Sequence, residues 1–401
     1  MHLCGINQPQ VILALIPGGS PEEILFLPEK NPSREFWDGI RFGVPTGNRH
    51  SGDLNDVRVL TGIKDIRRRG EFDDWYKTWV RHSRKNFVNA FYHAYRKGRE
   101  IKITKTDHNY EFKSHLEKMA QDIRPKFEIH SCAPLHFQLR LPLEPDQTRD
   151  IDRATSITRE AFQETLSRWK IFKNENEVAA SLEYGMRRRS PYGLSFPTIV
   201  AGGQNATVLH YLKNDEILRP GSLVLMDFGA RFGTMHADIS RTVPSTGKFN
   251  PLQRLLYGIV LDAQKFGEKF ARPGRTIREL DAAVWDFTEA ALKKRFFALG
   301  GKAERAYDHK PHGVSHLMGE QEHDGDPHKF YQDEPLRTGW QISNEPGLYG
   351  RFTLKWRGRR YDEMLGIRIE DNLLITKTGC LNLSLSIPRE IKTIESRMHT
   401  A

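Results

Sequence analysis

Acidic residues stand directly at the ends of apolar runs that are typical of buried strands. The run Leu223–Met226 is followed at once by Asp227, and Asp238 precedes the β-branched segment Ile239–Val243. Glycines between the two aspartates permit a turn, so the carboxylates can face each other across an antiparallel hairpin. Two buried carboxylates at close range lose hydration and repel each other, which raises their pKa values unless cations lie between them. The fold must therefore supply partners for these acids.

Two arrangements of Asp227 and Asp238 fit this hairpin. In one, cations bind between the two carboxylates. In the other, one aspartate pairs with Arg241 and its neighbour lies in solvent. The hairpin alone favours neither arrangement.

Three later segments add side chains of the ligand type. His312 and His316 flank a small-residue turn, and His323-Asp324 follows. Glu345 ends a strand-like stretch, and Glu370 ends a segment in which apolar and charged residues alternate. One buried histidine is usually a core residue, and one strand-terminal glutamate usually a salt-bridge partner. Together, four carboxylates and one histidine favour a shared metal site over five separate explanations.

The length of 401 residues predicts two domains. The first part is typical of a mixed α/β domain, with short strands over 11–16 and 23–28, helices over 74–99 and 110–123, and an extended stretch over 127–141. The aromatic residues spaced along 74–99 are interpreted as core.

From about residue 135 the pattern repeats. Two helices precede extended segments, and the same order then recurs, which indicates an internal duplication with a site between the halves. The helices are expected over 151–166, 178–186, 255–271 and 277–287, and the extended segments over 198–243 and 312–385.

Charge, cysteines and hydropathy limit the function. The net charge of +10 is compatible with a nucleic-acid-binding protein. The basic clusters are scattered among acidic residues, however, and no nucleic-acid motif accompanies them. This pattern favours a solvated basic surface. Three distant cysteines without metal spacing, Cys4, Cys132 and Cys380, are typical of reduced thiols in a cytoplasm. No apolar run reaches the length of a membrane span. We expect neither nucleic acid nor membrane as partner.

The ordered Asp, Asp, His, Glu, Glu series resembles the metallopeptidases of the pita-bread fold, which include Xaa-Pro aminopeptidase, prolidase and methionine aminopeptidase. The likeness is strongest to Xaa-Pro aminopeptidase (aminopeptidase P). It is carried by the segments 208–211 (Val-Leu-His-Tyr), 226–230 (Met-Asp-Phe-Gly-Ala), 238–244, 312–316 (His-Gly-Val-Ser-His), 344–349 (Asn-Glu-Pro-Gly-Leu-Tyr) and 366–371.

The resemblance implies an α+β chain. A pita-bread catalytic domain over 135–401, in which helices on a curved antiparallel sheet occur twice, would follow a smaller aminopeptidase P-like α/β domain over 1–134. Residues 3–8 resemble a stretch that normally lies well inside that smaller domain. The N-terminal domain is therefore expected to be truncated at its N-terminus.

The resemblance also implies a two-metal mechanism. Asp238 and Glu370 would bridge two divalent ions, Asp227 would chelate one, and His316 and Glu345 would complete the other. Hard oxygen ligands with one imidazole suit manganese, with cobalt or zinc as alternatives. A hydroxide held between the ions would attack the carbonyl carbon before proline, and Glu345 would carry the proton to the leaving nitrogen.

Further residues match positions around the substrate in this family. His210, His312 and His323 are expected to act in catalysis and substrate binding, the last two near the scissile carbonyl or the proline that follows it. Arg368 either binds substrate or pairs with a ligand carboxylate. The expected substrates are peptides with proline in the second position, and a homo-oligomer is compatible with the family.

Some alternatives stay open. Prolidase, which cleaves only dipeptides, is the nearest one, and a catalytically inactive pita-bread binding protein is another. The sequence departs from the family at Ser343-Asn344, where a threonine and an apolar residue are common, and over 325–338, where Lys329 and Arg337 are candidates for other substrate contacts.

Overall fold

The computed structural model describes residues 10–32, 35–36, 41–45, 54–82, 85–88, 107–125, 127–131, 140–308, 310–325 and 330–399, together with Cys4 and Ile6. The chain divides into two compact units, Met1–His136 and Phe137–Ala401. Each has its own hydrophobic core.

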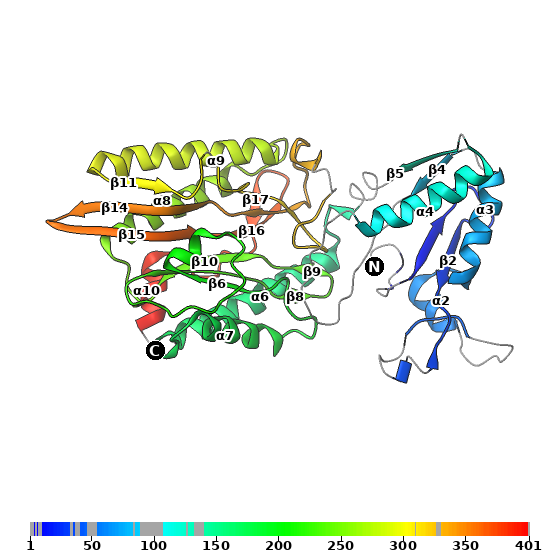
Figure 1. Ribbon diagram of the computed structural model, residues 1–401, viewed down its shortest axis with the longest axis horizontal. Helices are drawn as coiled ribbons and strands as arrows, with labels where there is room; N and C mark the ends of the chain where they lie inside the picture. The colour runs from blue at the N-terminus through cyan, green and yellow to red at the C-terminus, as the bar shows by residue number, and fades with distance from the viewer. Residues whose placement is uncertain are drawn as a thin grey trace. The chain divides into compact units, whose positions relative to one another are not determined.

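The first unit contains a three-stranded sheet. The two predicted strands are β1 (Ile12–Leu15) and β2 (Glu23–Leu27), which pair antiparallel, and β3 (Asp65–Arg68) lies parallel to β2. Its core joins Phe26 of the sheet to Phe72, Tyr76 and Val80 of a helix. The other elements are α2 (Asn55–Thr61), η1 (Arg69–Glu71), α3 (Phe72–His82), β4 (Lys85–Val88), α4 (Asp107–Ile123) and β5 (Glu128–Ser131) (Figure 1).

The helix predicted over 74–99 is wrong in its second half. It ends at His82, and Lys85–Val88 forms a strand that pairs in parallel with β5, so sheet pairing overrides the helical spacing. Trp75 and Trp79 pack against the core, as expected for the aromatic stripe. Residues 89–106 and 132–139, where the rest of this helix and of the stretch 127–141 were expected, lie outside the described residues.

The second unit contains the four predicted helices. Two of them begin with a capping box: in α8 and α9 the N-cap residues Asn250 and Thr276 exchange hydrogen bonds with Gln253 and Glu279. The strands run between the α8/α9 pair and the α6/α7 pair (Figure 1). The helices are α6 (Pro145–Ser167), α7 (Glu175–Arg187), α8 (Pro251–Phe270), α9 (Ile277–Ala291) and a C-terminal α10 (Ile391–His399).

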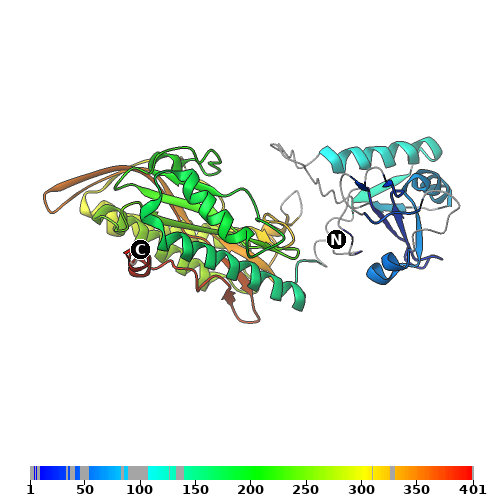
Figure 2. The same cartoon turned by 90° about the horizontal axis from the view of Figure 1, so that it is seen from below.

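Three antiparallel sheets follow the helix pairs, which gives the repeated order that the sequence predicts. The first is β10-β7-β6, the second β11-β14-β15 and the third β12-β13-β16-β17. Figure 2 shows β14 and β15 as a long projecting hairpin. The strands are β6 (Ile199–Gly202), β7 (Leu223–Phe228), β10 (Ile239–Pro244), β11 (Lys302–Arg305), β12 (Leu317–Met318), β13 (Gln341–Asn344), β14 (Gly347–Trp356), β15 (Arg359–Arg368), β16 (Asp371–Ile375) and β17 (Cys380–Asn382), with a small hairpin of β8 (Arg231–Phe232) and β9 (Met235–His236). Short helical turns are η2 (Trp169–Ile171), η3 (Gly203–Thr207), η4 (Leu292–Phe296), η5 (Phe297–Leu299) and η6 (Phe330–Gln332).

Two facing breaks interrupt the antiparallel pairing at the candidate site. Asn344 of β13 pairs with Asp371, and Gly347 of β14 pairs with Arg368, so two residues on each side lie between the ladders. The backbone N–H of Glu345 instead donates to Val314 (2.8 Å), and that of Glu370 donates to Ser240 (3.0 Å). Each break therefore places one glutamate against another part of the chain, Glu345 against the segment before β12 and Glu370 against β10.

None of the described helices is long and apolar enough to span a membrane.

Candidate metal centre

The five residues predicted as metal ligands lie together, each at a strand end. Asp227 is in β7 and Asp238 just before β10, His316 precedes β12, and the two glutamates occupy the breaks. Their side chains are largely withdrawn from solvent: Asp238 is 5% and Glu370 2% exposed. The prediction that these residues share one site agrees with their placement.

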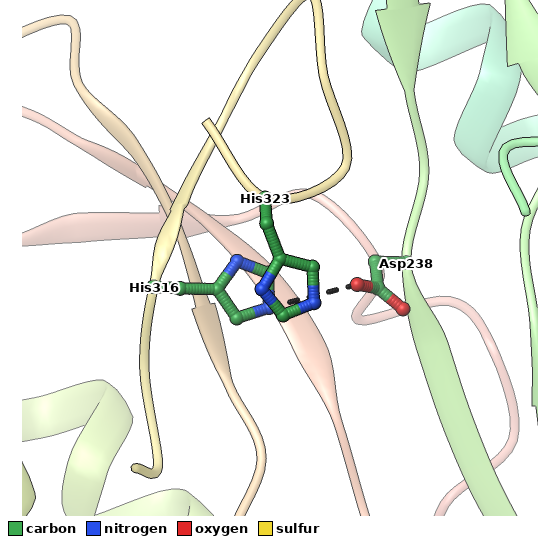
Figure 3. Close-up of side chains that lie close together, drawn as sticks. All are labelled: Asp238, His316 and His323. Atoms are coloured by element: carbon green, nitrogen blue, oxygen red, sulfur yellow. Dashed lines mark ion pairs between the residues drawn. The ribbon is translucent and has the colours of Figure 1, made fainter. Parts of the chain in front are cut away.

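Two overlapping groups of three residues have ligand atoms within 4.8 Å of one another. One contains Asp227, Asp238 and Glu370, and the other His316, Glu345 and Glu370. A third group joins Asp238 and His316 to His323 (Figure 3). Glu370, Asp238 and His316 each belong to two groups. Of these three, only the two carboxylates have a pair of oxygens, which is what two neighbouring cations require of a bridging ligand.

A glycine lets the two aspartates approach. A Cβ on Gly229 would lie 1.8 Å from the carbonyl oxygen of Ala237, so only glycine fits where β7 meets the returning strand. The alternative in which Arg241 neutralises one aspartate is wrong. Arg241 pairs with Asp371 at 2.7 Å, and Asp227 and Asp238 are both buried.

The imidazole of His316 is oriented for metal binding. Its Nδ1 lies 3.1 Å from the carbonyl oxygen of Leu317, so the proton belongs on Nδ1 and the lone pair on Nε2. That Nε2 is 3.4 Å from Glu345 Oε1 and 3.7 Å from Asp238 Oδ2. The hydroxyl of Ser343 accepts from the His316 N–H (3.0 Å) and donates to Glu345 (3.4 Å).

Arg368 and Ser240 connect the carboxylates on the other side. Arg368 Nη2 is 2.5 Å from Asp227 Oδ2, and its Nε donates to Ser240 Oγ at 2.7 Å. The Ser240 hydroxyl in turn donates to Glu370 Oε2 at 2.8 Å. Arg368 is therefore the partner of a candidate ligand.

The buried carboxylates of the candidate centre lack enough neighbouring positive charge to stay ionised at their ordinary pKa values. Burial, followed by the charges of Glu370 and Asp227, raises the pKa of Asp238 well above its ordinary value. Burial and then Glu345 raise the pKa of Glu370, and burial raises the pKa of Glu345 to about 8. Bound cations would reverse these shifts by stabilising the charged carboxylates.

An unsatisfied oxygen tests whether the residues fit metal ions. Asp227 Oδ1 is buried and has no hydrogen-bond partner among the described residues. A buried carboxylate oxygen without a donor is costly, whereas a cation ligated by it removes that cost. Four carboxylates and one imidazole at these positions fit two hard divalent ions.

The three predicted substrate histidines have different surroundings. His312 Nε2 is 2.9 Å from the Tyr349 hydroxyl, and burial lowers the pKa of His312 to about 4, so it is neutral near pH 7. His323 stacks on His316 with ring centroids 4.0 Å apart. His210 is exposed, and its charge is among those that lower the pKa of His312.

Sequence reasoning missed three side chains that contact the centre. The Tyr349 hydroxyl contacts both His312 and Arg368. The Ser240 hydroxyl lies between Arg368 and Glu370 and bonds to both. The Asn372 side chain accepts from the backbone N–H of Asp238 and donates to its carbonyl. A polar residue on a buried strand beside a candidate ligand was the available signal.

The departures from the family pattern are partly explained. Asn344 donates to the carbonyl of Gln264 at 2.8 Å and so ties β13 to α8. Arg337 pairs with Glu334 at 3.4 Å on an exposed surface. Lys329 lies outside the described residues.

Comparisons with known proteins agree with this fold. Residues 149–377 match the model of metallopeptidase family M24, and residues 1–67 match the aminopeptidase P N-terminal domain. The chain is 30% identical over 402 residues to the mitochondrial intermediate cleaving peptidase 55 of Arabidopsis thaliana, covering all of this chain and 74% of that protein. It is 30% identical over 420 residues to Xaa-Pro aminopeptidase 3 of Rattus norvegicus, covering 98% and 75%. Zinc-substituted Escherichia coli aminopeptidase P in complex with product has the same fold, with a TM-score of 0.78, 24% identity and coverage of 99% and 87%.

Proposed function

The chain belongs to metallopeptidase family M24, and we propose that it is an Xaa-Pro aminopeptidase, which releases the N-terminal residue from peptides with proline in the second position. The observation that carries the proposal is the pair of overlapping ligand groups around Glu370. Names of relatives support the substrate class, since the rat protein is an Xaa-Pro aminopeptidase.

We assign the candidate ligands to two ions. Asp238 and Glu370, the two carboxylates of the shared group with Asp227 that also reach the His316 side, would bridge them. Asp227 would bind one ion, and His316 with Glu345 the other. The predominance of carboxylate oxygen favours Mn(II).

Two divalent ions there would supply Lewis-acid polarisation of the scissile carbonyl and an activated water near neutral pH. The chain's own residues would do the rest. Glu345 would pass the proton released by the activated water to the leaving proline nitrogen. Neutral His312 and the exposed His323 would contact the peptide, and Arg368 would keep Asp227 in its ligand orientation.

The compartment is part of the proposal. Cys4 and Cys380, the two cysteines that the structure describes, form no disulfide. Free thiols fit a reducing compartment such as the cytoplasm.

Reconstitution with Mn(II) tests the function. The protein should release arginine from Arg-Pro-Pro, fail on Arg-Ala-Pro, and act weakly on the dipeptide Gly-Pro, with products identified by mass spectrometry. Asp238→Ala should abolish release, whereas Asp262→Ala, an exposed aspartate of α8 paired with Arg295, should keep it.

Each other outcome has a meaning. Cleavage of Gly-Pro alone would make the protein a prolidase. Equal inactivity of wild type and Asp238→Ala on every peptide would overturn the proposal, and salt-dependent nucleic-acid binding in that case would favour a binding protein.

A further inference from the structure

Residues 319–325 form a loop that brings His323 to the candidate metal centre. The His323 ring lies over that of His316, with an interplanar angle of 11° (Figure 3). The loop closes through the Asp324 N–H, which donates to Leu317 at 2.9 Å, and through the Gly319 N–H, which donates to Gln321 at 3.1 Å. The position of His323 therefore depends on what holds this loop.

A buried ion pair holds the loop directly beside His323. Both guanidinium nitrogens of Arg140 bind the Asp324 carboxylate, Nη1 at 2.7 Å from Oδ2 and Nη2 against Oδ1. Arg140 is 5% and Asp324 4% exposed. The sequence separation of 184 residues means that the pair joins the segment ahead of α6 to the loop.

A second contact fixes the other side of His323. Glu320 Oε2 lies 3.8 Å from Arg140, and Glu320 Oε1 accepts from Gln147 in the first turn of α6 at 3.4 Å. The backbone of Gly319 packs closely against the Asp324 carboxylate, because a Cβ there would lie 2.6 Å from Asp324 Oδ2. Asp324 and Glu320 thus anchor the loop, while the His323 side chain is 44% exposed.

The geometry of this pair favours one position of the loop. Removing one partner of a buried ion pair leaves an uncompensated charge, which is strongly unfavourable, so the remaining carboxylate would turn toward water. A planar guanidinium also fixes the carboxylate in angle, which an ammonium group does not. Since His323 precedes Asp324 in the chain, a rotation of Asp324 would displace it.

We propose that Arg140 is a positioning residue for peptide hydrolysis: through Asp324 it holds the 319–325 loop so that His323 lies over the candidate metal centre. This inference rests on the proposed function. The contacts of Arg140 with Asp324 and Glu320 both hold the loop, and through them its effect on the reaction would pass to His323.

A double-mutant cycle tests the proposal. Arg140→Lys and Asp324→Asn should each lower kcat/KM on Arg-Pro-Pro about tenfold or more, as loss of a residue that orients an active group commonly does. In a His323→Ala background neither change should lower it further, because the group they position is gone. Arg278→Lys, in an exposed bidentate pair with Asp333, is the matched control and should leave kcat/KM unchanged.

A purely structural role would give a different result. Arg140→Lys would then lower the melting temperature without lowering kcat/KM. Alternatively, the fold-decreases in kcat/KM caused by Arg140→Lys and by His323→Ala would multiply in the double variant. Either result would overturn the proposal. Inactive wild type on all Xaa-Pro peptides would instead refute the proposed function.

Hydrogen exchange provides a readout that needs no activity. Arg140→Lys and Asp324→Asn should speed exchange of the amides in residues 317–325, where Leu317 accepts from Asp324, and leave β7 and β10 protected. Unchanged exchange in this segment would contradict the proposal. Should Asp324→Asn fail to fold, Arg140→Lys keeps the positive charge and tests the same point.

Discussion

At the scale of single residues, the candidate centre concentrates negative charge where water is scarce. Asp238, Glu345 and Glu370 all have raised pKa values, and burial is the largest cause for each. Arg368 opposes the shift at both glutamates. Protons therefore compete with metal ions for the same oxygens.

The pH dependence of the metal-free protein follows from Glu345. Its pKa rises from 4.5 to about 8 on folding, so the folded state keeps a proton that the unfolded chain loses. The stability from this group is full below the unfolded pKa and is lost as pH rises through the folded one. We expect the melting temperature of metal-free protein to fall from about pH 5 to about pH 9, and to fall less steeply in Glu345→Gln.

A thermal melt series in chelator measures this slope. Glu304→Gln, an exposed glutamate of β11, should keep the wild-type slope. Parallel slopes for wild type and Glu345→Gln would show that Glu345 is not the titrating group.

Ser240 is expected to matter for metal binding although it is no candidate ligand. Ser240→Ala removes the acceptor of Arg368 and the donor to Glu370, so both lose their orientation. We expect Mn(II) affinity, measured by calorimetric titration, to fall roughly 10- to 100-fold. Ser222→Ala removes only a bond to Arg219 within an exposed turn and should leave the affinity unchanged. Equal affinities in the two variants would contradict this role.

At the scale of elements, the β7–β10 hairpin depends on Gly229. Gly229→Ala would place a methyl group against the Ala237 carbonyl, one residue from Asp238. We expect a loss of about 3 kcal/mol or more in the free energy of unfolding, because backbone rather than a flexible side chain opposes the methyl group. Mn(II) binding should weaken in parallel.

Denaturant unfolding of Gly229→Ala and Gly379→Ala checks this expectation. A Cβ on Gly379 meets nothing within 4 Å, and its φ is not in the left-handed region, so that variant should unfold like wild type. If Gly229→Ala unfolds with the free energy of wild type, the hairpin of β7 and β10 accommodates the methyl group and the expectation is wrong.

Periodicity predicted the elements of the second unit well, because its helices carry capping signals and broad apolar faces, as in Asn250 and Gln253 of α8. It was less successful in the first unit. There Lys85–Val88 is a strand because of its partner β5, about 40 residues away in sequence, and local spacing carries no such information.

The sequence pointed to the candidate ligands, but not to the side chains that hold them in place. Strand-terminal acids and flanking residues point to the candidate ligands, because an acid after an apolar run is visible locally. Tyr349, Ser240 and Asn372 act through contacts across long sequence distances: Asn372 holds Asp238 from 134 residues away. Neither the buried pair of Arg140 and Asp324 nor that of Arg241 and Asp371 has a local signal.

At the scale of the whole molecule, the two units have separate cores, and all candidate ligands lie in one of them. Metal binding should stabilise the unit that holds the ligands. We expect added Mn(II) to slow hydrogen exchange in β7, β10, β13 and β16, and to leave β1 and β2 unchanged. Asp238→Ala should remove the protection. Equal protection in both units would contradict a metal site confined to residues 137–401.

The hydrogen bond between Ser240 and Glu370 joins residues 130 positions apart. A ribosome that has released only the first half of the catalytic unit has produced both aspartates but neither glutamate. Two of the five candidate ligands therefore emerge well before the other three, and a nascent chain of that length could not hold the proposed metal pair. Metal acquisition would follow synthesis of nearly the whole chain, and a truncated product ending before residue 370 would emerge unable to hold both ions.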